Sequence, residues 1–108
     1  MVVQNPTHLA GVQVLPGLKI EMAQPLHSLL VAGIPVALGS DGPMSPYLNI
    51  MLDSIDPDRP AEAMTREEAI IAYTLTAAYT EFAEKDKGSL EPDKLADLAV
   101  LSQDRTAT

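Results

Sequence analysis

The feature that most constrains the fold of this chain is a continuous apolar run, Ile34-Pro35-Val36-Ala37-Leu38, which is closed by Gly39. An uninterrupted apolar run of this length is typical of a strand that is buried on both faces, as in a parallel sheet covered by helices. A proline is tolerated at the first residue of such a strand, which is where we place Pro35. The run therefore predicts an α/β fold.

The residues before this run have the pattern of a helix. Leu26, Leu29 and Leu30 follow at helical spacing after Pro25, and a proline is tolerated in the first turn of a helix. Gly33 then stands where a helix commonly ends. A helix, a short turn and a buried strand in succession are typical of α/β proteins.

Further elements are predicted along the rest of the chain. A short strand is expected at Val2 and Val3, just before the Asn5-Pro6 turn signal. The residues Thr65 to Glu68 fit a capping box, in which the first residues of a helix exchange hydrogen bonds. We also expect a weak extension at Val12 and Val14, and a short helix over Tyr47 to Ser54 with Leu48, Met51 and Leu52 on one side. The capped helix continues or restarts through Ala77, Ala78 and Phe82, and a final strand is expected over Leu95 to Leu101.

Composition and charge argue against several classes of function. The 108 residues carry a net charge of −8 and a pI of about 4.4, so we expect no nucleic acid and no membrane surface as a partner. The chain has no Cys, which excludes disulfides, thiolate metal ligands and a cysteine nucleophile. Its first residues lack the regions of a signal peptide, and no apolar stretch is long enough to span a bilayer. We therefore expect a cytoplasmic protein.

The segment with the clearest chemical meaning is Gly39-Ser40-Asp41-Gly42-Pro43, directly after the buried strand. Barrels of the α/β type place catalytic and metal-binding groups at the carboxyl ends of their strands. A carboxylate there can bind a divalent cation through oxygen or accept a proton from a metal-bound water. An Asp-Gly pair after a strand is also a common turn, so these residues alone leave both interpretations open.

The run from Leu29 to Pro43 resembles the last barrel strand of the amidohydrolase superfamily, in its family 3 branch. Three other segments match in the same order, and together they cover nearly the whole chain. They are Val2 to His8, which resembles the preceding strand, Thr65 to Ala78, which resembles the helix after the last strand, and Lys87 to Leu98, which resembles the return into the small β domain of the family.

This resemblance implies a fold and an activity. The fold would be a (β/α)8 TIM-type barrel with a small composite β domain. Residues 1–84 would form the last two β/α units of the barrel, and residues 85–108 the return strand into the small β domain, which would be truncated. The activity would be hydrolysis of a non-peptide C–N bond in a small-molecule amide, by water activated on a divalent metal with zinc as the first choice. Asp41 matches the family's aspartate after the last strand, which implies two roles for it, metal ligand and base for the attacking water.

Departures from the family pattern limit what the isolated chain is expected to do. No His-x-His is present, and the chain contains only His8 and His27. A barrel of this type needs about 250 residues, so we expect the chain to be the C-terminal part of a longer parent. Asp93 stands where the family usually has Gly, and the last four residues do not resemble the family's continuation. We expect the isolated chain to bind no metal and to be inactive.

The two histidines have simple alternative interpretations. His8 follows a strand-like run and could contact a substrate at the mouth of a barrel, although a histidine in a surface loop is the simpler interpretation. His27 lies on the first predicted helix and is expected to face solvent or to be partly covered. Two histidines without further partners do not make a zinc site, which needs three or four ligands.

Two hypotheses for function follow from the sequence. The chain is either the C-terminal part of a metal-dependent amidohydrolase or a non-catalytic remnant that acts as a self-associating structural module. Both favour a homo-oligomer, because a barrel strand separated from its neighbours leaves unpaired edges beside Val36 and Leu38 that would recruit another copy. The metal content of the purified chain separates the two hypotheses.

Overall fold

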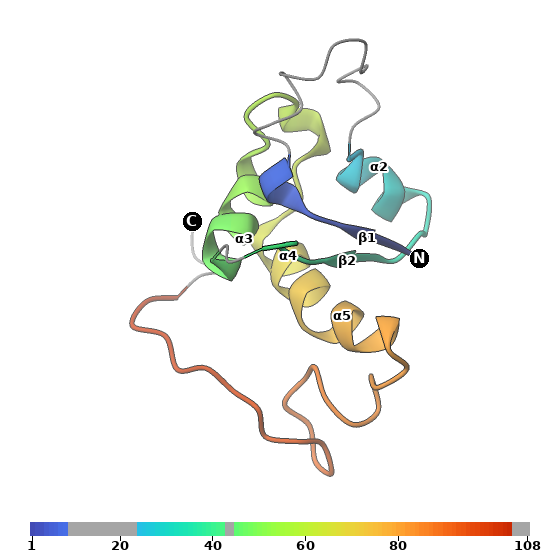
Figure 1. Cartoon of the computed structure of the whole chain (residues 1–108), viewed down its shortest axis with the longest axis vertical. Helices are drawn as coiled ribbons and strands as arrows, with labels where there is room; N and C mark the ends of the chain where they lie inside the picture. Colours follow the sequence, from blue (N-terminus) through green and yellow to red (C-terminus); the bar gives the residue numbers. More distant parts are fainter. Residues whose placement is uncertain (9–23, 43–44, 105–108) are drawn as a thin grey trace.

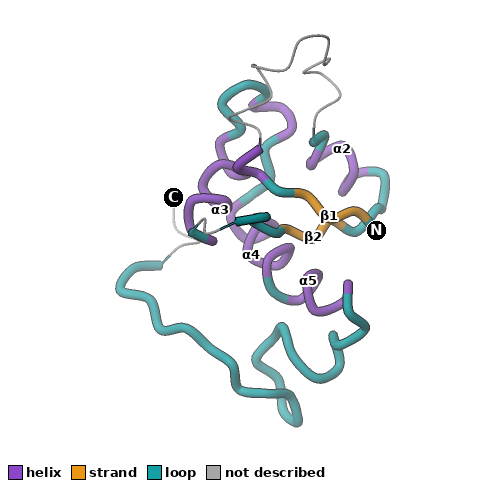
Figure 2. Tube along the Cα trace, in the orientation of Figure 1, coloured by secondary structure: helices purple, strands orange, loops and turns teal. Residues whose placement is uncertain are grey.

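The computed structural model describes residues 1–8, 24–42 and 45–104 (Figures 1 and 2). Figure 1 shows two strands at the centre with the helices arranged around them, which confirms the predicted mixture of helices and parallel strands. The elements in chain order are β1 (Val2–Gln4), the 3-10 turn η1 (Pro6–His8), α2 (Leu26–Val31), β2 (Val36–Leu38), α3 (Pro46–Ile55), the 3-10 turn η3 (Pro60–Glu62), α4 (Arg66–Tyr73) and α5 (Leu75–Thr80). The expected extension at Val12 and Val14 lies outside the described residues.

Within the described ranges, no helix is both long enough and apolar enough to cross a membrane.

The sheet consists of β1 and β2, which run parallel, so both predicted strands are confirmed. The amide of Val2 donates a hydrogen bond to the carbonyl of Pro35 at 2.9 Å. Pro35 therefore lies just before β2 and contributes only its carbonyl, rather than being the first strand residue as the sequence indicated. The opposed pairs of the sheet are Val2 and Val36, Val3 and Ala37, and Gln4 and Leu38.

Helix α2 ends as its sequence predicts. Gly33 has a φ of +73°, and its amide donates to the carbonyl of Leu30 at 2.9 Å. The next amide, that of Ile34, donates to the carbonyl of Leu29 at 2.9 Å. Glycine adopts this left-handed conformation without steric cost, and the two bonds satisfy carbonyls that the helix end leaves free. The chain can therefore reverse directly into β2.

The predicted capping box at the start of α4 is present. The amide of Glu68 donates to Oγ1 of Thr65 at 3.1 Å, and the amide of Thr65 donates to Oε2 of Glu68 at 2.8 Å. Hydrogen bonds from the amide and the hydroxyl of Thr65 to the Glu68 carboxylate lower the pKa of Glu68. The helix is interrupted at Thr74 and restarts as α5, and Phe82 lies beyond its end with a φ of +61°. The chain therefore forms two successive helices here, as in the predicted restart, and not one continuous helix.

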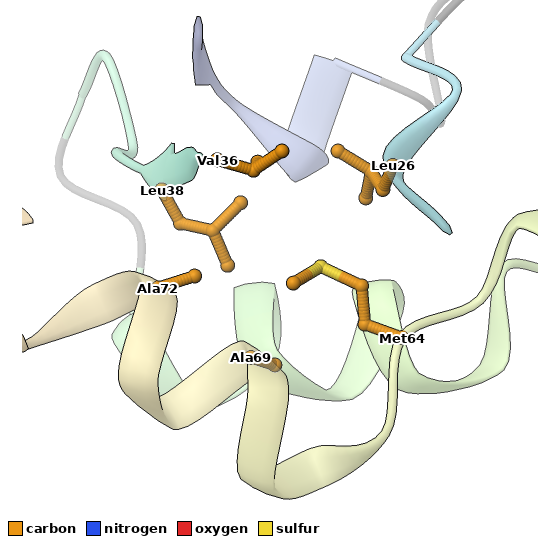
Figure 3. Close-up of a cluster of buried hydrophobic side chains, with 6 residues drawn as sticks. All are labelled: Leu26, Val36, Leu38, Met64, Ala69 and Ala72. Carbon is orange, nitrogen blue, oxygen red and sulfur yellow. The ribbon is translucent and has the colours of Figure 1, made fainter. Parts of the chain in front are cut away.

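The core lies between the sheet and α4 (Figure 3). Val36 and Leu38 extend from the same face of β2, because side chains alternate along a strand, and they meet the small residues Ala69 and Ala72 of α4. The alanines allow the helix to approach the strand closely. Leu26 and Met64 complete the buried cluster.

The expected final strand over Leu95 to Leu101 is wrong, because the structure assigns no strand to these residues. A strand needs a neighbour that pairs with its main-chain groups, and within the described ranges no segment pairs with this one. Figure 2 shows residues 89–104 entirely as loop. The assignment of residues 85–108 to a small β domain stays a prediction.

Candidate functional site at the carboxyl ends of the strands

The parallel arrangement of β1 and β2 brings the residues that follow them to the same edge of the sheet. Asn5 follows β1, and Gly39, Ser40 and Asp41 follow β2. The amide of Gly39 donates to the carbonyl of Gln4 at 2.8 Å, which extends the pairing one residue beyond β2. The candidate site is therefore built on residues whose backbone is fixed by the sheet.

Two asparagines hold the carbonyl of Gly39. Nδ2 of Asn49, on α3, donates to this carbonyl at 3.4 Å. The side-chain amide of Asn5, with its nitrogen oriented toward the two carbonyls, donates to those of Gly39 and Gln4, both at 3.3 Å. A Cβ atom at position 39 would lie 2.9 Å from the end of the Asn5 side chain, so a larger residue there would displace this amide. The exit of the chain from β2 is thus fixed from two directions.

Asp41 lies two residues beyond Gly39, at the carboxyl end of β2 where the sequence placed it. Its side chain is exposed, and its φ of +48° is a left-handed conformation that aspartate tolerates better than most residues. Oγ of Ser40 donates to the carbonyl of Gly42 at 2.9 Å, which closes the turn around Asp41. Among the described residues, no three His, Cys, Asp or Glu side chains come together as a metal site. The proposed roles of Asp41 stay predictions.

The structure does not bring the two histidines into this site. His8 is the last residue of η1, and its side chain is outside the described part of the structure, so its predicted substrate contact stays a prediction. His27 is exposed on α2, which agrees with the expectation that it faces solvent.

A line of buried polar residues on α3 was not predicted. Asn49 and Asp53 lie on the buried side of the helix, and Asp56 is buried directly after its end. Nδ2 of Asn49 donates to the hydroxyl oxygen of Tyr73 at 2.7 Å, which links α3 to α4. Oδ1 of Asp56 accepts a hydrogen bond from the amide of Arg59 at 2.9 Å. The spacing of these residues is one sequence signal that could have identified them, because positions four and seven apart share a helix face.

Asp53 is the least satisfied member of this line. Both of its carboxyl oxygens are buried without a hydrogen-bond partner, although its main-chain carbonyl accepts from the amide of Met64 at 2.9 Å. Burial and, to a smaller extent, the nearby charge of Asp56 together raise the pKa of the Asp53 carboxyl to about 8. Asp53 is therefore mainly protonated at neutral pH. It is buried, whereas Asp41 is exposed.

Comparisons with known proteins agree with the resemblance found in the sequence. Residues 7–108 match the family model described as "Amidohydrolase family". The chain is 36% identical over 89 residues to N-substituted formamide deformylase from Arthrobacter pascens, covering 74% of this chain and 16% of that protein. It is 35% identical over 85 residues to Protein LONG AFTER FAR-RED 3 from Arabidopsis thaliana, covering 69% of this chain and 15% of that protein. No solved structure matches the chain. The chain thus spans about one sixth of the length of these relatives.

Proposed function

Since this chain belongs to the amidohydrolase family, we propose that it is the C-terminal part of a hydrolase that cleaves non-peptide C–N bonds in small amides. The name of the Arthrobacter relative, an N-substituted formamide deformylase, supports hydrolysis of C–N bonds in this family. The observation that carries the proposal is the position of Asp41, at the carboxyl end of a buried strand in a parallel sheet. This is the position of catalytic groups in α/β barrels.

The two faces of the sheet support a barrel for the complete protein. Val36 and Leu38 lie on the face that α4 covers, whereas Val3 and the buried Ala37 lie on the other face. Val3 is 57% exposed. In a closed barrel the face opposite the helices lines the interior, where an apolar residue such as Val3 would be covered by other strands.

Asp41 would act as a proton acceptor in this proposal. Its carboxylate would take a proton from the attacking water, whose oxygen forms a bond to the amide carbon as the C–N bond breaks and the amine leaves with a proton. The family resemblance implies a divalent metal, zinc being the first choice. The described residues do not fit a complete metal site, because Asp41 is a single oxygen ligand without the two further protein ligands that a catalytic site needs. We therefore assign the metal to the complete protein and not to this chain alone.

A chimeric enzyme tests this proposal. The matching segment of the Arthrobacter formamide deformylase is replaced by the aligned residues of this chain, and hydrolysis of an N-substituted formamide is measured. We expect the chimera to be active and its Asp41→Asn variant to lose detectable turnover, because the amide neither binds a cation as well nor accepts the proton. The matched control is Asp58→Asn, an exposed acid in the loop before η3, which should retain activity. A folded chimera that keeps its turnover after Asp41→Asn would refute the role of Asp41.

A second candidate function is that of a non-catalytic, self-associating module. It is favoured by the outward apolar side of α3, where Met51 and Ile55 are exposed. Elemental analysis of the purified chain for zinc, iron and manganese separates the two candidates. Because no three ligating side chains come together among the described residues, we expect substoichiometric metal and no amide hydrolysis. Stoichiometric metal that is lost in Asp41→Ala would instead show that the chain completes a metal site by itself.

The proposed location and partners rest on charge and composition. A net charge of −8 supports a protein that binds neither nucleic acid nor an anionic membrane, and a cytoplasmic location stays a proposal. The proposed partner of the complete enzyme is a small-molecule amide, and the proposed partner of this chain is a second copy of itself.

A further inference from the structure

Asn49 is a fully buried polar side chain on α3, the helix that follows Asp41 in the chain. Helices α3 and α4 lie beside the carboxyl end of β2 (Figure 1). Burying an amide costs free energy unless its groups are hydrogen-bonded, so the partners of Asn49 indicate its role. Because none of this side chain is exposed, the rest of a longer protein cannot cover it further.

The amide nitrogen of Asn49 carries two hydrogens, and it has two partners. Nδ2 donates to the carbonyl of Gly39 at 3.4 Å and to the hydroxyl oxygen of Tyr73 at 2.7 Å. The amide oxygen Oδ1 is buried without a partner. The reverse orientation of the amide would place this oxygen against the Gly39 carbonyl, and two acceptors would then face each other. The orientation of Asn49 is therefore determined by what its nitrogen contacts.

The Gly39 carbonyl belongs to the peptide group that joins Gly39 to Ser40, directly before Asp41. The amide of Gly39 is bonded to the carbonyl of Gln4 at 2.8 Å. That bond fixes the amide side of Gly39, but not the peptide group that follows it. Rotation of this peptide group would change the direction in which Ser40 and Asp41 leave the sheet. The hydrogen bond from Asn49 opposes that rotation.

Tyr73 fixes the Asn49 amide from the side of α4. The distance of 2.7 Å between Nδ2 and the hydroxyl oxygen indicates a stronger bond than the 3.4 Å to the Gly39 carbonyl. Tyr73 is partly buried and packs against the hydrophobic core, which fixes the position of its hydroxyl. Rotation of the Asn49 amide away from Gly39 would therefore also break the bond to Tyr73.

A link between the helices α3 and α4 would require only the hydrogen bond from Asn49 to Tyr73. The second bond, to Gly39, connects both helices to the strand that precedes the candidate catalytic residue. Asn5 donates to the same carbonyl at 3.3 Å from the end of β1. Side chains from two elements thus converge on one main-chain carbonyl beside the turn of Asp41, and a third element orients one of them.

We infer that Asn49 and Tyr73 are positioning residues for Asp41. Tyr73 orients the amide of Asn49, and Asn49 fixes the peptide group from which the turn of Asp41 begins. The catalytic consequence rests on the proposed function of Asp41 as the base that accepts a proton from water. The base must lie within hydrogen-bond distance of that water, and a displacement of about 1 Å can lower a rate about a hundredfold.

NMR of the full chain tests the contact with Gly39 without requiring hydrolysis. The chemical shift of the Gly39 carbonyl carbon decreases when its oxygen loses a hydrogen bond. We expect such a decrease in Asn49→Ala and a smaller one, in the same direction, in Tyr73→Phe. The matched control is Tyr79→Phe, which removes an exposed hydroxyl from α5 and should leave this signal in place. An unchanged Gly39 signal in folded Tyr73→Phe would overturn the inference.

A double variant tests whether Tyr73 acts through Asn49. When Asn49 is replaced by alanine, loss of the Tyr73 hydroxyl should not change the Gly39 signal further, so the two effects should not add. Fully additive changes would show that Tyr73 acts independently, and its assigned role would be wrong. Tyr73→Phe keeps the aromatic ring in the core, so this variant should fold even if Asn49→Ala does not.

The chimera with the Arthrobacter enzyme measures the catalytic consequence. Asn49→Ala should lower kcat about tenfold to a hundredfold, and Tyr73→Phe about threefold to tenfold, with KM within about twofold of the unsubstituted chimera. The reason is that both residues are assigned to the reacting base and not to substrate binding. Tyr79→Phe should leave both constants unchanged.

The outcomes of these experiments separate this inference from the proposed function. A kcat within about twofold of the unsubstituted chimera for both Asn49→Ala and Tyr73→Phe would overturn the positioning role, even if Asp41→Asn abolishes turnover. Turnover that survives Asp41→Asn would instead refute the proposed function, and the Gly39 carbonyl signal in the full chain would still decide whether Tyr73 and Asn49 fix this peptide group.

Discussion

Asp53→Asn is expected to stabilise the protein by about 2 to 4 kcal/mol at pH 8. Asp53 is buried without a hydrogen-bond partner for either carboxyl oxygen, and its pKa is raised to about 8. The unfolded chain releases this proton near its usual pKa of 3.8, whereas the folded chain holds it until about pH 8. The folded state therefore loses stability steadily as the pH rises between these two values.

The expected gain is smaller than the full pKa difference implies. A shift from 3.8 to about 8 corresponds to roughly 6 kcal/mol, but the buried amide of an asparagine also loses hydrogen bonds to water. Urea unfolding followed by circular dichroism at pH 5 and pH 8 measures the effect. The wild type should be less stable at pH 8 than at pH 5, and Asp53→Asn should remove most of that difference.

A matched control for Asp53→Asn is Glu67→Gln, which removes a carboxylate from an exposed position on α4. It should leave the pH dependence between 5 and 8 nearly unchanged, with an effect within about 0.5 kcal/mol. If Asp53→Asn instead lowers the stability at pH 8, then the Asp53 carboxylate has a bound cation or another stabilising partner. That result would remove the physical basis of the prediction.

The folded protein is also expected to lose stability at acidic pH. The pKa of Glu62 is lowered by its hydrogen bonds with Ser28, and that of Glu68 by its hydrogen bonds with Thr65. The stabilisation from these two groups is present above their usual pKa of 4.5 and is lost as the pH falls through their lowered values. Together with Asp53, they predict maximal stability at a mildly acidic pH of about 5.

Gly88→Ala is the substitution expected to destabilise the fold most, by about 3 kcal/mol. Gly88 has a φ of +95°, a backbone conformation that residues with a side chain rarely adopt. A Cβ atom there would lie 2.9 Å from Cβ of Ala78, 2.9 Å from Cα of Leu75 and 3.0 Å from the carbonyl oxygen of Thr74. Two of these atoms belong to the main chain at the start of α5, so they cannot move aside without disturbing the helix.

Gly33→Ala is the matched control for Gly88→Ala. Gly33 also has a positive φ, +73°, but a Cβ atom there would have no atom within 4 Å. This substitution should cost only the backbone strain of about 1 to 2 kcal/mol. The difference between the two unfolding free energies measures the packing of Gly88 against α5. Equal losses for both variants would mean that the residues after α5 do not pack as described.

The elements that could be predicted from the sequence are those with local signals. The capping box of Thr65 and Glu68 starts α4, and Gly33 ends α2, because both depend on hydrogen bonds within a few residues. The break at Thr74 has no such signal, since neither Gly nor Pro lies there. The sequence therefore left open whether the helix continues or restarts.

The orientation of α3 could not be predicted, because both of its sides have helical spacing. Leu48 and Met51 form one stripe, and Asn49 and Asp53 form another. Which stripe faces inward depends on distant residues, above all on the hydroxyl of Tyr73 and the carbonyl of Gly39, which accept from Asn49. A pattern within one helix contains no information about such partners.

The position of Asp41 after a strand could be predicted from the sequence, but the residues that surround it could not. The sequence placed Asp41 after a buried strand, and the structure agrees. Asn5 was interpreted only as part of a turn signal, although its side chain reaches the carbonyl of Gly39. That contact requires β1 to lie beside β2, and the pairing of two distant strands is not visible in either sequence segment.

The register of Val2 with Val36 has a consequence for the order of events during synthesis. β1 is made before β2, and its pairing partner follows 34 positions later, so β1 waits for its hydrogen bonds until β2 has been made. Closing this long loop costs entropy before any contact is gained. The main-chain groups of Val2 and Val3 therefore stay without these hydrogen bonds until β2 has emerged.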